Sequence, residues 1–176
     1  MLYEGLQKAA EKKGWKLQGA NELTEFMLHM PITIEGEEDG VPIQISRASS
    51  LHTLATSALF KPNLTPAFEI AREGVKGAIA GALGIEDVKV GDAAFDDAFR
   101  LVSKDAEALK KLLTPAVQAI VRELAAATES FGSHFIITES VVWLQRPNWG
   151  TLTEDEVLQD VPLVVRAAKA IAAASR

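Results

Sequence analysis

The fold class is decided by the stretch Ile32-Thr33-Ile34-Glu35-Gly36-Glu37-Glu38-Asp39-Gly40-Val41-Pro42-Ile43-Gln44-Ile45. Branched apolar residues recur at every second position on both sides of Asp39-Gly40, a pair typical of two-residue hairpin turns that need positive φ. Pairing across this turn places Ile34 opposite Ile45, so the isoleucines of both strands share one face. The stretch therefore predicts an antiparallel hairpin with one buried face.

More strands are expected directly after this hairpin. A third is predicted near residues 52–60 and a fourth over 67–72, where Phe68 and Ile70 alternate with polar or small residues and would point toward the core. Because the connections are short, the four strands over 31–72 are expected to form a meander.

Two segments flank these strands. Residues 2–14 predict a short amphipathic helix that ends at Gly14, and the pattern leaves open whether this helix docks or lies at the periphery. Residues 75–84 are rich in alanine but contain three glycines, each costing about 1 kcal/mol relative to alanine inside a helix. An ordered helix is therefore disfavoured over 75–84.

The second half alternates between strands and helices. A short strand over 99–102 is followed by a helix for which Ser103 is the expected cap, and Thr114-Pro115 then starts another helix with a cap and a first-turn proline. That second helix has a single apolar stripe at helical spacing, formed by Val117, Ile120, Val121 and Leu124.

A hairpin and a divided helix complete the chain. Strands are predicted over 133–137 and 141–145, and Thr153 with Glu156 forms the pattern of a capping box. Pro162 is expected to kink or split the last helix. The sequence therefore predicts one domain over 1–176, with a strand-helix-helix-hairpin-helix order over 98–176. Its class is α+β, with a mainly antiparallel sheet packed against two or three helices.

Composition excludes several kinds of chemistry. The chain of 176 residues has no cysteine, which rules out disulfides, thiolate catalysis and zinc sites built on cysteine. Its 24 acidic and 18 basic residues give a net charge of −6, so nucleic acid is not an expected partner. No membrane span is predicted, because the longest apolar tract, over 74–85, is much shorter than the ~20 residues required. A cytoplasmic protein, or the soluble domain of a membrane-anchored one, is expected.

The histidines and serines form no recognisable catalytic pattern. His29, His52 and His134 are far apart in sequence and form no HxH or HExxH pair, so a metal site built on them is disfavoured. Ser133 precedes His134, but neighbours on a strand point to opposite faces. No GxSxG elbow is present.

The most enzyme-like feature is the acidic segment over 86–97. Its carboxylates Asp92, Asp96 and Asp97 could bind a hard cation or act as an acid and base, although their spacing differs from that of a calcium loop. The alternative interpretation is a solvated turn in which Asp92 caps a short turn and Phe95 and Phe99 form its apolar side.

Aromatic residues supply the candidate ligand site. Trp143 and Trp149 flank a loop before the last helix, and an exposed tryptophan there would be a binding anchor. A cleft between sheet and helices is predicted near Phe60, Phe68 and Trp143. No cofactor is expected.

One stretch resembles a known pattern. Residues 88–99 contain Gly91-Asp92-Ala93-Ala94-Phe95-Asp96-Asp97-Ala98-Phe99 and are followed by Leu112-Leu113-Thr114-Pro115. This G-D-x-x-F-D-x-x-F and L-L-T-P arrangement resembles uncharacterised bacterial domains of unknown function, which often carry a glycine- and proline-containing hairpin like that over 36–42. The resemblance implies a soluble bacterial domain, sometimes found beside membrane segments, and carries over no catalytic residues.

The residues themselves indicate that this motif is structural. Phe95 and Phe99 are expected as core anchors and Asp96 as a hydrogen-bond acceptor in a turn. The leading functional hypothesis is a non-catalytic domain that binds a protein partner, an apolar small molecule or a second copy of itself. The alternatives are a hydrolase or metal-dependent enzyme using the acidic segment, and a structural module of a membrane-associated assembly.

Overall fold

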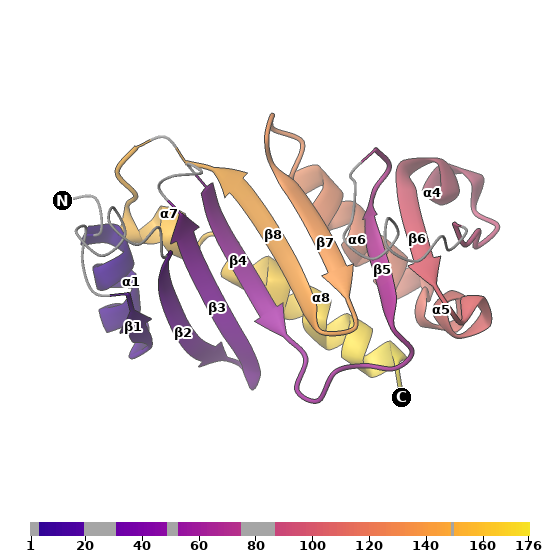
Figure 1. Cartoon of the computed structure of the whole chain (residues 1–176), viewed down its shortest axis with the longest axis horizontal. Coiled ribbons are helices and arrows are strands. Elements are labelled where there is room, and N and C mark those ends of the chain that lie inside the picture. The colour runs from indigo at the N-terminus through magenta and orange to yellow at the C-terminus, as the bar shows by residue number, and fades with distance from the viewer. Residues whose placement is uncertain (1–3, 20–30, 49–52, 75–86, 149) are drawn as a thin grey trace.

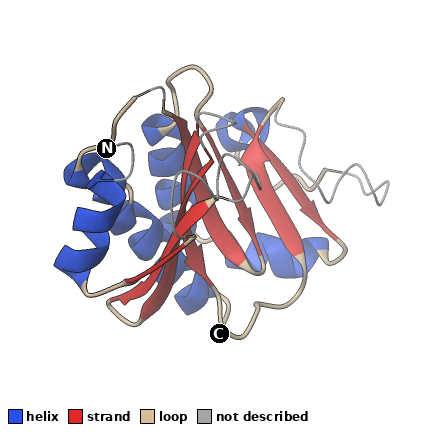
Figure 2. Ribbon diagram, turned by 60° about the vertical axis from the view of Figure 1, so that its left-hand side comes forward, coloured by secondary structure: helices blue, strands red, loops and turns tan. Residues whose placement is uncertain are grey.

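The predicted strands join one eight-stranded antiparallel sheet in the order β1-β2-β3-β4-β8-β7-β5-β6 (Figure 1). The computed structural model describes residues 4–19, 31–48, 53–74, 87–148 and 150–176. Helices gather on one face of the sheet (Figure 2), which confirms the α+β class. The strands are β1 (Lys16–Gln18), β2 (Ile32–Glu38), β3 (Val41–Ala48), β4 (Thr53–Leu59), β5 (Phe68–Arg72), β6 (Phe99–Ser103), β7 (His134–Thr138) and β8 (Val141–Pro147). The helices are α1 (Glu4–Lys13), α4 (Ala93–Ala98), α5 (Ala106–Leu112), α6 (Pro115–Ala127), α7 (Glu154–Leu158) and α8 (Val161–Ala174).

The hairpin formed by β2 and β3 has the predicted register. Ile34 pairs with Ile45, and both side chains are fully buried on the face that carries the helices. Asp39 and Gly40 have φ values of 54° and 78°, the left-handed conformation that a two-residue turn of this type requires. The alternation of the sequence thus set both the pairing and the buried face.

The predicted meander is wrong at its fourth strand. β5 forms over the expected residues but does not pair with β4, because the β7–β8 hairpin lies between them. Residues 60–67 therefore cross the lower edge of the sheet from β4 to β5 and pass the end of α8 (Figure 1). β8 takes the place predicted for β5 beside β4, and the short strand β1, which the sequence did not predict, pairs with the outer side of β2.

The helices over 98–176 form where the sequence predicts, and one of the predicted capping residues is wrong. Thr114 accepts from the amide of Val117, and Thr153 forms the full capping box with Glu156. The division at Pro162 is also confirmed, since α7 ends before it and α8 begins with it in the first turn. The prediction that Ser103 caps α5 is wrong. Asp105 takes that position, and the Ser103 hydroxyl accepts from the Asp105 amide.

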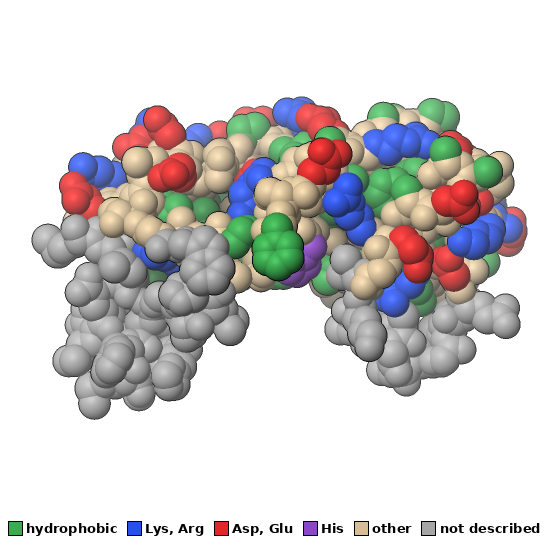
Figure 3. Space-filling model, turned by 90° about the horizontal axis from the view of Figure 1, so that it is seen from above, with side chains coloured by type: hydrophobic (Ala, Val, Ile, Leu, Met, Phe, Trp, Pro, Cys, Tyr) green, Lys and Arg blue, Asp and Glu red, His purple; other side chains and the backbone are tan. Residues whose placement is uncertain are grey.

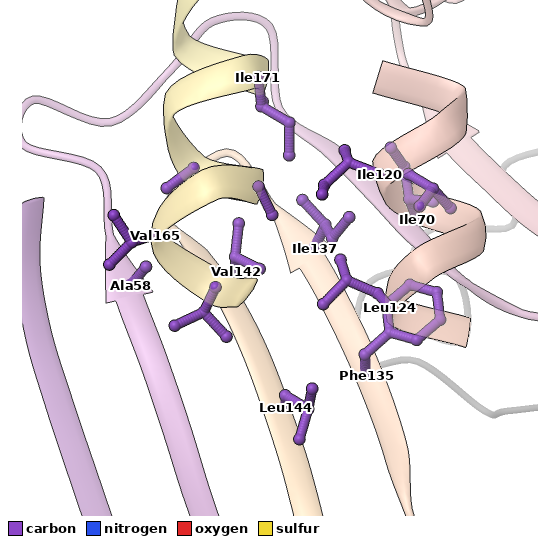
Figure 4. Packing of buried hydrophobic residues seen from close by; sticks show 14 of the residues in the cluster. Ala58, Ile70, Ile120, Leu124, Phe135, Ile137, Val142, Leu144, Val165 and Ile171 are labelled. Carbon is purple, nitrogen blue, oxygen red and sulfur yellow. The ribbon is translucent and has the colours of Figure 1, made fainter. Parts of the chain in front are cut away.

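The core lies between the sheet and its helices. Figure 4 shows Val165 of α8 beside Ala58 and Val142 of the sheet, while Leu124 of α6 packs near Phe135. The predicted stripe on α6 is buried, and the predicted anchors Phe95 and Phe99 are in contact as tilted rings with centroids 4.6 Å apart.

The N-terminal helix is docked. The side chains of Leu6, Ala9 and Ala10 on α1 are buried in the same core, and Gly14 follows its last turn with a φ of 65°. The segment over 75–84, whose order the sequence disfavours, lies outside the described residues. None of the helices in the described ranges is long and apolar enough to span a bilayer.

Candidate ligand-binding groove

A groove of about 500 Å³ opens at the lower end of the sheet. It is bounded by the tip of the β2–β3 hairpin (residues 39–42), the start of the β4–β5 connection (59–64) and the end of α8 with the residues after it (168–176). We call this cavity the α8 groove. Its volume falls within the ~300–1,000 Å³ range of small-molecule sites.

The groove exists because of small side chains on one wall and a braced segment on another. Ala168 and Ala172 line the α8 side, where larger residues would fill the space. On the other side, the amides of Phe60 and Leu64 donate to the carbonyls of Ser140 and Glu139 at 2.9 and 2.7 Å. The β7–β8 turn therefore holds the connection at a fixed distance from the helix.

The α8 groove has an apolar interior and a charged mouth. Phe60 is only 6% exposed and Leu59 and Leu64 are half-buried, whereas Lys61 and Arg176 are exposed. Such an arrangement suits a molecule with one apolar and one polar part.

A second cavity of about 250 Å³ adjoins the groove. It is lined by Phe68 of β5, by Leu109 and Lys111 of α5, and by the end of the chain. Leu64 and Arg176 border both cavities, so the two meet at this point. We call the second cavity the α5 pocket.

The predicted aromatic residues are divided between the two faces of the sheet. Phe60 and Phe68 lie on the helix-bearing side at neighbouring cavities, but Trp143 points to the opposite face, since its neighbours Val142 and Leu144 are buried in the core. The indole of Trp143 makes an edge contact with His134, with ring centroids 5.0 Å apart. Trp149 lies outside the described residues.

Trp143 nevertheless borders a hollow of its own. A cavity of about 430 Å³ on that face is lined by Trp143, Ser57 and Gln44, and it shares Phe60 and Lys61 with the α8 groove. Leu59 and Asn63 also line both cavities, so the start of the β4–β5 connection joins the cavity beside Trp143 to the α8 groove.

The acidic segment has the geometry of a braced turn. Asp92 caps α4 by accepting from the Phe95 amide at 3.1 Å, and its other oxygen accepts from Arg122 at 2.8 Å. The hydrogen bond from the Phe95 amide, followed by that from the Arg122 guanidinium, lowers the pKa of Asp92 below its ordinary value. The predicted capping role of Asp92 is confirmed.

Asp96 is likewise committed to the backbone. Its two carboxylate oxygens accept from the amides of Val90 and Gly91 at 2.8 and 2.9 Å, which confirms the predicted role as a turn acceptor. Asp97 is exposed. Within the described ranges, no three or more His, Asp or Glu side chains form a group that could hold a metal ion.

Ser133 and His134, the remaining candidates within the described ranges, contact other residues and not each other. The Ser133 hydroxyl lies 2.7 Å from that of Ser130, while His134 contacts Trp143. His29 and His52 lie outside the described residues. Over the described surface seen in Figure 3, acidic and basic side chains are interspersed, with no broad field of positive charge.

Sequence reasoning missed two features. The basic residues at the mouth of the α8 groove come from distant segments, and no local pattern relates them. Phe131 is 98% exposed on the turn between α6 and β7. Its position between Ser130 and Gly132 is the local signal that could have identified it as a turn residue.

Comparisons with known proteins identify a shared fold. No protein-family model matches the chain, and no curated protein matches it significantly. The crystal structure of the mycobacterial trehalose monomycolate transport factor A, TtfA, is similar, with a TM-score of 0.62 at 11% sequence identity. The match covers 99% of this chain and 94% of that chain. At this identity the likeness shows the fold alone, and it extends over nearly the whole of both chains.

Proposed function

We propose that this chain is a non-catalytic binding domain that holds an amphipathic, lipid-like molecule in the α8 groove and acts in lipid transport. The observation that carries the proposal is the groove itself, a cavity of about 500 Å³ with a buried aromatic floor and a polar mouth. The interior suits an acyl chain, and the open mouth leaves room for a head group in water.

The fold likeness to TtfA supports the transport part of the proposal. That protein is named as the mycobacterial trehalose monomycolate transport factor A. A shared fold does not establish a shared function, so the binding test must be made on this chain.

The test is a titration with a neutral single-chain amphiphile that carries a fluorescent reporter on its acyl chain. Ala172→Leu places a larger side chain in the α8 groove and is expected to weaken binding by about tenfold, because overpacking a filled site costs about 1–3 kcal/mol. Ala126→Leu makes the same change at an exposed position of α6 and is the matched control.

Equal affinity of the two variants would contradict the proposed site. The absence of any binding, accompanied by concentration-dependent light scattering, would favour the alternative of self-association. Circular dichroism of both variants shows whether a loss of binding reflects a loss of fold.

A further inference from the structure

The charge balance reverses at the lower end of the molecule. The whole chain has 24 acidic and 18 basic residues. The α8 groove and the α5 pocket together are lined by four basic side chains, Lys61, Lys111, Lys169 and Arg176, and by one acidic side chain, Asp39.

Only one of these basic side chains is neutralised locally. Lys169 pairs with Asp39 at 3.0 Å. Lys61, Lys111 and Arg176 make no ion pair with the part of the chain that the structure describes. The C-terminus of α8 contributes a partial negative charge of about one half, and a carboxylate on residue 176, the last of the sequence, adds a full one. Together they offset about half of the three positive charges, so the rim keeps an excess of positive charge.

These charges lie at the mouth and not in the interior. All three side chains are exposed, while Phe60 and Phe68 beneath them are buried. Arg176 borders both cavities, whereas Lys61 lines the α8 groove and Lys111 lines the α5 pocket, so a group bound beside Arg176 would have one lysine at each adjoining cavity.

We infer that the ligand of the α8 groove carries an anionic head group, a carboxylate or a phosphate, that binds at Lys61 and Arg176, with Lys111 adding positive charge from the adjoining α5 pocket. This inference rests on the proposed function, since it names the class of the amphiphile that the groove takes. The acyl chain lies against the apolar floor, and the head group faces Lys61 and Arg176 at the rim.

The test compares three amphiphiles of equal chain length with carboxylate, phosphate and neutral glycerol head groups. At low salt the tighter of the two anionic probes is expected to bind about tenfold more strongly than the neutral one. Two or three exposed ion pairs with the head group are enough for a difference of this size. The difference is expected to shrink as salt is added. The preferred anion identifies the head group.

A charge-neutralising variant locates the effect. Lys61→Gln with Arg176→Gln is expected to reduce the affinity for the anionic probe to that for the neutral probe, while the affinity for the neutral probe stays unchanged. Lys16→Gln with Lys104→Gln removes the same charge at exposed positions away from both cavities and is the control.

The outcomes separate the inference from the proposed function. Equal affinities for the neutral and anionic probes, or an equal loss in the two double variants, would overturn the anionic head group and leave the groove as a binding site. If no probe binds and Ala172→Leu changes nothing, the proposed function fails as well.

Discussion

The indole ring of Trp15 occupies the space in which residue 36 would carry a side chain. A Cβ atom on Gly36 would lie 2.1 Å from Cγ of Trp15. The indole nitrogen also donates to the carbonyl of Glu37 at 3.1 Å, so the ring is fixed over β2 beyond the end of the short β1 strand. Trp15 therefore packs against the core over the face of β2 at Gly36 and holds the Glu37 carbonyl at the same time.

Gly36→Ala is therefore expected to destabilise the protein by about 1–3 kcal/mol, as overpacking does. Gly150→Ala is the matched control, because a Cβ atom there would have no neighbour within 4 Å. Urea unfolding measures both, with the midpoint lowered for Gly36→Ala and nearly unchanged for the control. Equal midpoints would show that Trp15 moves aside without cost.

Local elements of this fold could be predicted because their determinants are adjacent in sequence. The register of Ile34 with Ile45 depends on one turn, and the start of α7 depends on Thr153 and Glu156. The position of β5 could not be predicted in this way. Its partners β6 and β7 are selected by packing across the whole sheet, which no local alternation records.

Part of the candidate site could also be predicted from features that are local in the sequence. Phe60 and Phe68 stand out as aromatic residues near strand ends, and both border cavities. Lys61 and Arg176 are 115 positions apart in sequence, so only the path of the β4–β5 connection past α8 brings them to one mouth. The alternation of β8, in which Val142 and Leu144 are buried, directs Trp143 to the face opposite that of Phe68.

The ion pair between Arg146 and Asp160 gives a second prediction. Nε and Nη2 of Arg146 each donate to one oxygen of Asp160 at 2.7 Å, and the Asp160 side chain is only 6% exposed. Asp160→Ala leaves the half-buried guanidinium without its partner and is expected to cost about 3 kcal/mol or more. Arg146→Met combined with Asp160→Leu is expected to recover part of that loss in urea unfolding. A single variant as stable as the parent would mean that water replaces the carboxylate.

Acid sensitivity follows from two capping carboxylates. In the folded protein the pKa of Asp92 is lowered, chiefly by the hydrogen bond from the backbone amide of Phe95. The pKa of Glu156 is lowered chiefly by the hydrogen bond from the backbone amide of Thr153. The unfolded chain then binds more protons at acidic pH. The stabilisation is therefore present above the unfolded pKa values of about 4 and is lost as the pH falls through the folded pKa values. Asp92→Asn is expected to be less stable than the parent at pH 7 and equally stable at the acid end. A constant difference across the pH range would contradict the shift.

The turn between α6 and β7 presents Phe131 without burying it. The Ser133 amide donates to the Ser130 carbonyl at 3.0 Å, and Gly132 has a φ of 79°, so the backbone holds the turn independently of the phenyl ring. Phe131→Ser is therefore expected to change the free energy of unfolding by less than about 0.5 kcal/mol. Gly132→Ala, which strains the same turn, is expected to destabilise more. Calorimetric melting of both variants would test this order.

The alternative function, in which the acidic segment binds a metal ion, can be tested at Asp96. Both of its oxygens already accept backbone amides, so Asp96→Ala is expected to leave the Val90 and Gly91 donors unpaired and to cost about 2 kcal/mol or more. Because these oxygens and those of Asp92 are engaged, calcium, magnesium or manganese is expected to leave the melting temperature of the parent chain unchanged. Glu107→Ala, on the exposed surface of α5, is the control. A rise in melting temperature with metal that persists in this control but disappears in Asp96→Ala would support a cation site in the acidic segment.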